Sequence, residues 1–587
     1  MQPRVYSKRY FSVPDLAILM LVATVIYGVV SIGNQWRAEY HPVTKIDLSL
    51  WSLPYYTLMS ATRATVAYLI SLCFTLVIGY LAAKSRFAEK IIIPLLDIFQ
   101  SIPVLGFLPG LILGLVAIFP HTNTGLELAA ILMIFTGQVW NMTFSYYSSL
   151  KSVPTEFREA STVMGLNWRE NLTKVELPFS AVNLAWNSLL SMAGGWFFLI
   201  PCEAFTLGDK EYRLPGIGAY MDSAIKQGDH EAMVSAVVAM VLLIVLMDFA
   251  IWRPIMAWVQ KFRLEEIPGV GGVEPLMQIW IRESKILRWV HLNYRDLVLR
   301  RRLRRSKNSE PLDRVIQMKA PSLHRWFNGI VEKSRSPVFQ KSVEVLFLLV
   351  AGSVLVVGAY KLLNVLFQVP PLTWLMLLRN TLWTFCRVLF SLMISTLWAV
   401  PVGIWIGTSP ARIRFAQPMI QVLASFPAPM LYPLALGVFF ALGISFDWGA
   451  MLLMLLGVQW YVLFNVLAGA LRIPRELAYA MELMDTSTWE KWKVLYIPSV
   501  FPSLVTGWVT AAGGAWNASV VAEYLFFRGG ILKTAGLGST LSIATANEDF
   551  TLFAASLTVM VLVVVLLNRL VWSRMYNLAQ NRYRMDN

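Results

Sequence analysis

The side chains of this chain that could do chemistry are a few charged residues set among long apolar stretches. Arg63 and Arg387 stand near one end of two such stretches, where a cation could attract an anionic substrate or reach lipid headgroups. Glu203 and Glu523 end two others, where they could gate a pathway or cap a helix and face water. We expect the second role for these glutamates. Ionisable groups in apolar stretches are costly, so all four are candidate functional residues.

Three further polar candidates come before prolines. Gln100 and Ser101 precede Pro103, and Ser425 precedes Pro427. A proline inside a helix removes a backbone donor and bends or breaks that helix. We therefore expect these three side chains to lie where a broken helix exposes backbone groups to a pathway.

Other kinds of site are not indicated. Cys73, Cys202 and Cys386 lie in or at the end of apolar runs and lack the C-x-x-C spacing, which is typical of small buried hydrophobic residues. The five histidines are scattered and form no metal-ligand pattern. The chain contains no phosphate-binding G-x-x-x-x-G-K-S/T sequence. We expect this chain to bind no metal and no nucleotide.

The composition is that of a protein that crosses a membrane many times. The 587 residues are 57% hydrophobic and 14% charged, with a mean hydropathy of +0.57. Average soluble domains carry roughly 25% charged residues. The net charge of +15 lies largely beside the apolar stretches. It therefore indicates cytoplasmic loops rather than a nucleic-acid partner.

The chain contains two copies of one sequence unit, and this internal repeat determines how its domains are organised. Residues 137–253 align with 457–573 at a shift of 320 without a gap, and residues 63–109 align with 387–433 at a shift of 324. Asn517 has Phe197 as its counterpart, so one wall of any cavity between the copies would be asymmetric. Each copy also contains a pair of adjacent glycines, Gly194 and Gly195 in the first and Gly513 and Gly514 in the second. We expect these glycines to allow close helix packing rather than to bind a ligand.

Twelve membrane-spanning helices are predicted, six in each half. Those of the first half are 14–33, 59–83, 91–118, 126–149, 181–203 and 233–258, and those of the second half are 343–366, 378–407, 415–440, 447–470, 501–522 and 551–573. Lysine and arginine are concentrated at the N-terminus and after the second and fourth spans, which places both termini in the cytoplasm. An even span number then makes the halves parallel repeats.

The predicted domains are a first repeat at 1–258, a basic and amphipathic cytoplasmic linker at 259–342, and a second repeat at 343–587. Residues 276–299 alternate apolar and charged side chains and precede the basic run 300–305. We expect a helix on the cytoplasmic lipid surface here, and a solvated linker is the alternative.

The loop after the fourth span is long for a connection without its own structure. Pro154 suits a first helical turn and Gly165 suits a helix stop, which predicts a short cytoplasmic helix between them. The second copy keeps the frame from Pro474 to Pro498, so we expect its helix to be kept as well.

This loop resembles the EAA loop of ABC-importer permeases, whose pattern is E-A-A-x3-G-x9-I-x-L-P. The matching positions are Glu159, Ala160, Ser161, Gly165, Val175, Leu177 and Pro178, with Ser161 and Val175 as mild departures. The second copy departs further, and its corresponding positions are Tyr479, Ala480, Met481, Asp485 and Pro498. Equal coupling by the two halves is therefore in doubt.

The stretch from Gly513 to Glu523 followed by Gly536-Leu537-Gly538 resembles the nitrate/sulfonate/taurine branch of these permeases. The resemblance implies two permease units fused in one chain, with the type I ABC importer fold, in a bacterial inner membrane. It implies no enzyme activity in this chain, because two cytoplasmic ATP-binding subunits would carry ATP and Mg. It also implies a periplasmic or lipid-anchored substrate-binding protein, and a small anion or small organic nutrient as substrate.

Two alternatives stay open at this point. A secondary transporter with twelve spans in two parallel halves fits the span count equally well, but the long loop after each fourth span disfavours it. An export or lipid-handling permease is the other alternative, because the direction of transport rests on the resemblance alone.

Overall fold

The computed structural model describes residues 13–101, 104–207, 210–262, 284 and 337–582. Nearly all of the predicted linker, including its interfacial helix, lies outside these residues. By contacts the chain forms two compact units, one of residues 1–22 with 278–370, the other of residues 23–277 with 371–587. The smaller unit holds α17 (Pro337–Leu366) and a hydrogen bond of 2.6 Å from the Ser284 hydroxyl to Asp15. The larger unit holds helices of both halves.

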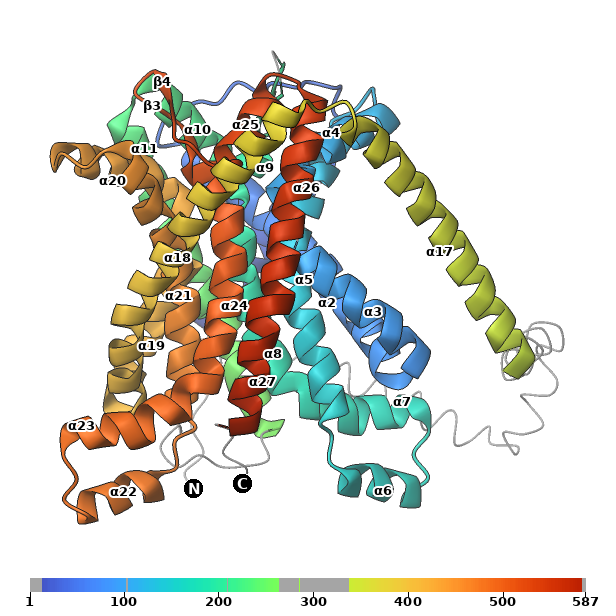
Figure 1. Cartoon of the computed structure of the whole chain (residues 1–587), viewed down its shortest axis with the longest axis vertical. Coiled ribbons are helices and arrows are strands. Elements are labelled where there is room, and N and C mark those ends of the chain that lie inside the picture. Colours follow the sequence, from blue (N-terminus) through green and yellow to red (C-terminus); the bar gives the residue numbers. More distant parts are fainter. Residues whose placement is uncertain (1–12, 102–103, 208–209, 263–283, 285–336, 583–587) are drawn as a thin grey trace, which may run out of the picture. The chain divides into compact units, whose positions relative to one another are not determined.

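The first half is a helical array with one small hairpin (Figure 1). Its elements are α1 (Val13–Arg37), α2 (Leu53–Lys84), α3 (Arg86–Ser101), a 3-10 turn (Val104–Phe107), α4 (Leu108–Ile118), α5 (Thr124–Lys151), α6 (Thr155–Val163), α7 (Trp168–Asn171), α8 (Leu177–Phe197), α9 (Leu199–Glu203), β1 (Ala204–Leu207), β2 (Lys210–Arg213), α10 (Ile217–Gln227), α11 (His230–Met247) and α12 (Arg253–Val259).

The second half repeats the same order of elements. They are α18 (Pro371–Gly407), α19 (Pro410–Ser425), α20 (Ala428–Ala441), α21 (Phe446–Ala470), α22 (Arg475–Leu483), α23 (Thr488–Glu490), α24 (Ile497–Ala522), β3 (Tyr524–Phe527), β4 (Gly530–Lys533), α25 (Leu537–Ala546), α26 (Phe550–Leu567) and α27 (Ser573–Arg582). Even the π-helical turns recur, at Leu172–Glu176 and Lys491–Tyr496, and again at Asp248–Trp252 and Asn568–Trp572.

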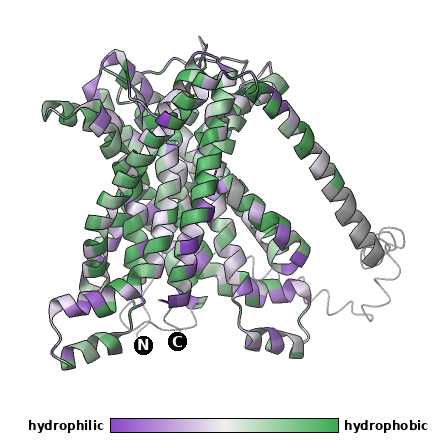
Figure 2. Ribbon diagram, in the orientation of Figure 1, coloured by the Kyte–Doolittle hydropathy of each residue, from purple (hydrophilic) through white to green (hydrophobic). Residues whose placement is uncertain are grey.

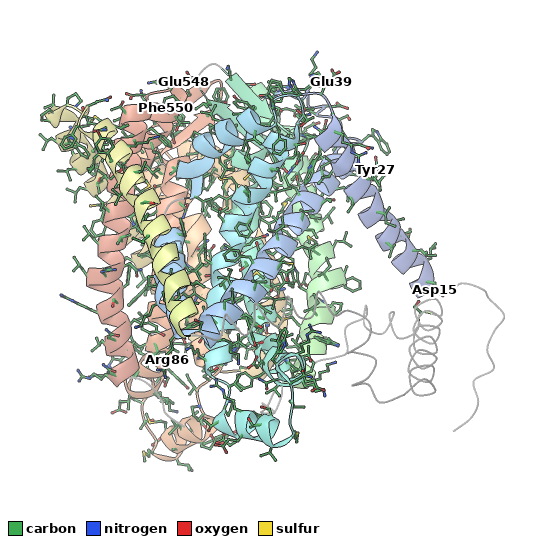
Figure 3. The ribbon with its side chains drawn as sticks, turned by 90° about the vertical axis from the view of Figure 1, so that its right-hand side faces the viewer. Asp15, Tyr27, Glu39, Arg86, Glu548 and Phe550 are labelled. Atoms are coloured by element: carbon green, nitrogen blue, oxygen red, sulfur yellow. The ribbon has the colours of Figure 1, made fainter. Side chains whose placement is uncertain are left out.

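The two halves run in the same direction, as the sequence predicts. In Figure 1, α6 and α22 lie at one end of the larger unit, whereas β3, β4, α10 and α25 lie at the other end. Figure 2 shows that this first end carries many hydrophilic residues and that the long helices are mostly hydrophobic. Arg86, at the start of α3, lies toward the end with α6, and Glu39 and Glu548 lie at the opposite end (Figure 3). The chain is therefore an all-α polytopic membrane protein built from parallel repeats.

Seven described helices are long and apolar enough to cross a membrane, or eight if the bent pair α19 and α20 forms one span. The count of twelve thus stays a prediction. The third span of each half is broken, as the prolines predict. Helices α19 and α20 meet at an angle of 88°, and in the first half α3 and α4 are only 16 and 11 residues long. Pro427 at the N-cap of α20 cannot donate a backbone hydrogen bond, so the helix is interrupted there.

Each half also contains an antiparallel β-hairpin that the sequence analysis did not predict. Strand β1 pairs with β2 and β3 pairs with β4. The second hairpin turns through Arg528 and Gly529, both with positive φ, which matches the twist of two-residue hairpin turns. The hairpins connect the end of each fifth span to the short helices α10 and α25.

Candidate functional site

Arg63 lies at the centre of a fully buried ion cluster in the first half. Its Nε and Nη2 donate to the two carboxylate oxygens of Glu127, each at 2.8 Å, and its Nη1 donates to Glu203. The hydroxyl of Ser60 also donates to Glu203, at 2.6 Å. These contacts join α2, α5 and α9. A buried guanidinium that is held by two carboxylates has its charge fully compensated.

Glu203 also explains two glycines of the first half. The backbone N–H of Gly218 donates to Glu203 Oε2 at 2.7 Å. A Cβ added at Gly216 would lie 2.2 Å from the same oxygen, so only glycine fits there. The start of α10 is thereby fastened to the carboxylate. Gly536 repeats the arrangement, because its Cβ would lie 2.1 Å from Glu523.

The ion cluster of the second half is built differently. Arg387 Nη1 donates to Glu523 at 2.8 Å, and Arg387 Nη2 donates to the Thr534 hydroxyl at 2.7 Å. Thr534 in turn donates to Asp447, the counterpart of Glu127. Asp447 is one methylene shorter, lies 3.9 Å from Arg387 and has a side chain that is 74% exposed. The Thr534 hydroxyl thus bridges Arg387 and Asp447, whereas Glu127 reaches Arg63 directly. The counterpart of Thr534 in the first half is Leu214, which has no hydroxyl.

These placements correct the sequence-based expectations for the charged candidates. Arg63 and Arg387 are buried and paired with carboxylates, so neither reaches toward headgroups. Glu203 and Glu523 are also buried and do not face water, because each accepts hydrogen bonds from an arginine, a hydroxyl and a helix N-terminus. Sequence reasoning missed Glu127. The acidic residue at the matching position of both repeats, Glu127 and Asp447, was the signal that could have revealed it.

A chamber of about 170 Å³ lies between the two halves. Its walls come from α3, α5 and α8 of the first half, and from α21, α24 and α26 of the second half. The lining residues that carry polar side chains are Gln100, Thr136, Trp140, Asn141, Tyr461, Thr510, Trp516, Asn517, Asn568 and Trp572.

Two of the sequence-predicted pathway residues, Gln100 and Asn517, line this chamber. Ser425 ends α19 and is not among the described lining residues, and neither are the four charged candidates. Ser101 ends α3, but its side chain is outside the described part of the structure. Phe197, the counterpart of Asn517, also lines the chamber, so the predicted asymmetry of its wall is present.

Asn517 connects the two halves at the break in the third span. Its Oδ1 accepts a hydrogen bond of 2.7 Å from the backbone N–H of Val104, which follows the break. Its Nδ2 donates to the carbonyl of Gly513 one turn earlier, at 3.1 Å. A backbone donor freed by a broken helix needs such a partner inside a membrane. Asp248 makes a second contact between halves, because it accepts from Gln421 Nε2 at 2.6 Å.

The glycines near the chamber have two different roles. A Cβ at Gly194 would lie 2.9 Å from the carbonyl oxygen of Gly137, and one at Gly195 would lie 2.6 Å from Gln138. These glycines allow close helix packing, as expected. Gly513 differs, since a Cβ there would meet nothing within 4 Å. It leaves open space in the chamber wall.

The two loop helices, α6 and α22, have the same construction, which confirms the predicted helix in both copies. Pro154 and Pro474 are their N-cap residues, and each C-cap is followed by a left-handed residue, Gly165 with φ +63° or Asp485 with φ +49°. The following turns begin with capping boxes, Asn167 with Glu170 and Ser487 with Glu490. Leu177-Pro178 and Ile497-Pro498 then start α8 and α24.

Hydrogen bonds hold these capping glutamates in place. A hydrogen bond from Lys174, and then one from the backbone of Asn167, lower the pKa of Glu170 below its ordinary value. The backbone N–H and hydroxyl of Ser487 lower the pKa of Glu490 in the same way. The first loop is also tied to the membrane helices, because Lys84 of α2 pairs with Glu176.

Both loop helices present apolar side chains to solvent. Val163 and Met164 end α6, Leu483 and Met484 end α22, and Val163 and Leu483 are 88% and 89% exposed. Glu159 and Ala160 are exposed on α6, as is Tyr479 on α22, whereas Ser161 is buried. Ala480 and Met481 are half-buried, and Asp485 is exposed. Adjacent exposed apolar residues on a polar end of a protein are typical of a protein–protein contact.

Parallel helical halves around a shared chamber, each with an exposed loop helix, are consistent with a membrane permease. The chain belongs to the family of binding-protein-dependent transport system inner membrane components, whose model matches residues 75–251 and again residues 399–584. The two matches correspond to the two repeats. This membership sets aside the secondary transporter.

Similarity to individual permeases is at the level of one repeat. The nitrate import permease protein of Synechococcus elongatus is 19% identical over 204 residues, which cover 35% of this chain and 67% of that protein. The taurine transport system permease protein of Escherichia coli is 25% identical over 192 residues, 32% of this chain and 66% of that protein. The diacetylchitobiose uptake system permease protein of Streptomyces coelicolor is 24% identical over 258 residues, 40% of this chain and 78% of that protein.

Proposed function

We propose that this chain is the transmembrane permease subunit of an ATP-driven importer, with both permease units in one polypeptide. Two cytoplasmic ATP-binding subunits hold ATP and Mg, and one subunit docks on α6 while the other docks on α22. A substrate-binding protein delivers a small anion or small organic nutrient at the opposite end, where the two hairpins lie. The protein resides in a bacterial inner membrane with both termini in the cytoplasm.

The pair of exposed apolar helix ends carries this proposal. Burying one side chain of the size of Val, Leu or Met stabilises a complex by roughly 1.5–3 kcal/mol before association costs. Each loop offers two such side chains on a short helix whose ends are fixed by a proline and a capping box. The helices lie at the same end of the larger unit (Figure 1), as two equivalent partners would require.

Docking helices can drive transport only if they are attached to helices of the pathway. The pair of Lys84 and Glu176 joins the first loop to α2. The loop then runs without a break through the π-helical turn Leu172–Glu176 into α8, whose residues Gly194 and Phe197 line the chamber. A displacement of the loop by closing ATP-binding subunits would therefore reach the chamber wall. ATP shifts the equilibrium between inward-open and outward-open states only by binding one of them better.

Copurification tests the proposal. The tagged chain is coexpressed with its ATP-binding subunits, as wild type and as Met164→Asp with Met484→Asp. Each replacement puts a charge on an exposed side chain, so the fold should be kept while docking is lost. Ile531→Asp is the matched control, because Ile531 is an exposed apolar residue on the hairpin β3–β4. Retention of the subunits by the double variant would refute the proposal.

A further inference from the structure

The described residues that line the chamber between the halves carry no formal charge. Its lining, within the described part of the chain, consists of amides, hydroxyls, indoles, aromatic rings, aliphatic side chains and glycines. Arg63 is held by two carboxylates away from the chamber, and Arg387 is held by Glu523. An ion that enters a low-dielectric site without a counter-charge pays a large desolvation penalty. The wall therefore disfavours ions of either sign.

Side chains whose hydrogen-bonding groups have no described partner line this space. The buried indole Nε1 of Trp140 has no partner among the described residues. The described residues also provide no hydrogen bond for the side chains of Gln100 or Tyr461, which line the same chamber. An indole can only donate, whereas a carboxamide and a hydroxyl can donate and accept. An oxoanion offers acceptors alone and would leave the carboxamide oxygen of Gln100 unpaired.

The chamber has room for a small solute. Its volume of about 170 Å³ is close to the ~150 Å³ of an engineered protein cavity that holds one benzene molecule. Aromatic rings from both halves line it, among them Trp140, which stacks on Phe99 at 6.0 Å and 14°. Gly513 contributes open space that its repeat counterpart, Ala193, would fill with a methyl group.

We propose that this chamber takes an uncharged polar solute of about one six-membered ring, with both hydrogen-bond donors and acceptors. Gln100 and Tyr461 exchange hydrogen bonds with the solute, Trp140 contributes its ring to the wall, and Gly513 provides the space for the ring of the solute. The counterpart of Gln100 is Ala424 and that of Asn517 is Phe197, so the two sides of the chamber offer different groups. The solute therefore binds in one orientation, although the two halves are repeats. This inference rests on the proposed function and narrows its substrate class to a neutral one.

Equilibrium binding to the full chain in lipid nanodiscs tests the inference. The probe is radiolabelled uracil, which carries two carbonyl acceptors and two N–H donors on one ring. Saturable binding is expected, and excess nitrate or taurine should not displace the probe. Displacement of uracil by nitrate or by taurine would overturn the inference. It would also be overturned if neither uracil nor a second neutral probe, 2-pyrrolidinone, bound saturably.

Two variants locate the binding. Gly513→Leu fills the chamber and should weaken binding at least about tenfold, whereas Tyr461→Phe removes one hydroxyl and should weaken it about 3- to 10-fold. Gly437→Leu is the control, because a Cβ there also meets nothing within 4 Å but lies outside the chamber lining. Unchanged binding by Gly513→Leu would overturn the inference. The assay needs no ATP-binding subunit, so its failure is distinguishable from failure of the copurification test.

Discussion

The side chain of Asn517, in the second half, accepts a hydrogen bond of 2.7 Å from the backbone N–H of Val104, in the first half. The bond caps a helix break in one half with a side chain from the other. If the two halves move apart, this hydrogen bond must lengthen, or the backbone at the break must move together with Asn517.

Replacing Asn517 by alanine should loosen the break. The Val104 N–H would lose its acceptor, and an unsatisfied buried donor costs about 1–3 kcal/mol. We expect faster hydrogen exchange over Val104–Phe107, measured by mass spectrometry on the protein in detergent. Asn517→Asp keeps an acceptor at the same place and should retain slow exchange in this turn. Equal exchange in the wild type and the alanine variant would contradict this role of Asn517.

The two ion clusters should differ in what they contribute to stability. Glu127→Ala removes two buried hydrogen bonds to Arg63 and leaves its Nε without a partner, and an unsatisfied buried donor costs about 1–3 kcal/mol, more for a charged group. Asp447→Ala removes a carboxylate that is mostly in water, and an exposed pair contributes about 0–1 kcal/mol. Thermal unfolding of the two purified variants measures the difference. Similar midpoints would show that the clusters are equivalent.

Asp485 should be replaceable by glycine with a gain in stability. Its φ of +49° lies in the left-handed region, where Gly165 stands in the other loop. Non-glycine residues are strained there, and we expect a local gain of about 0.5–1 kcal/mol from Asp485→Gly. Slower proteolysis of the second loop at limiting protease would report it. The reverse change, Gly165→Asp, should speed cleavage of the first loop, and the opposite order would contradict the account.

The first loop should lose its cap in acid. Hydrogen bonds from Lys174 and Asn167 make the pKa of Glu170 lower in the folded loop than in the unfolded one. The stabilisation is therefore complete above the ordinary glutamate pKa of about 4.3, and it is lost as the pH falls through the lowered value. A spin label on Met164→Cys, with the natural cysteines replaced, should become mobile in that range. Adding Glu170→Gln should remove the pH dependence, and an unchanged transition would contradict the assignment.

Local sequence signals predicted much of this architecture. The repeat shift placed equivalent helices correctly, Pro427 predicted the bend before α20, and Pro154 with Gly165 bounded α6 to within a residue. Gln100 and Asn517 line the chamber. Their polar side chains in apolar helices were the signal, because such side chains are rarely placed there without a partner or a cavity.

Long-range pairing could not be predicted in the same way. Arg63 meets Glu127 across 64 positions of the chain, and no local pattern encodes that contact. The hairpin strand Tyr524–Phe527 is a short apolar run that periodicity cannot separate from the end of a helix. The need for glycine at Gly216 likewise depends on the carboxylate of Glu203, which only the fold brings against it.

The most direct test of the central claim is ATP hydrolysis by the reconstituted complex. The ATP-binding subunits are assayed in proteoliposomes with the wild-type chain, with the Met164→Asp and Met484→Asp double variant, and without the chain. Docking through α6 and α22 predicts that the wild-type chain alters the hydrolysis rate and that the double variant behaves like liposomes without the chain. A hydrolysis rate that is the same in all three samples would contradict the account.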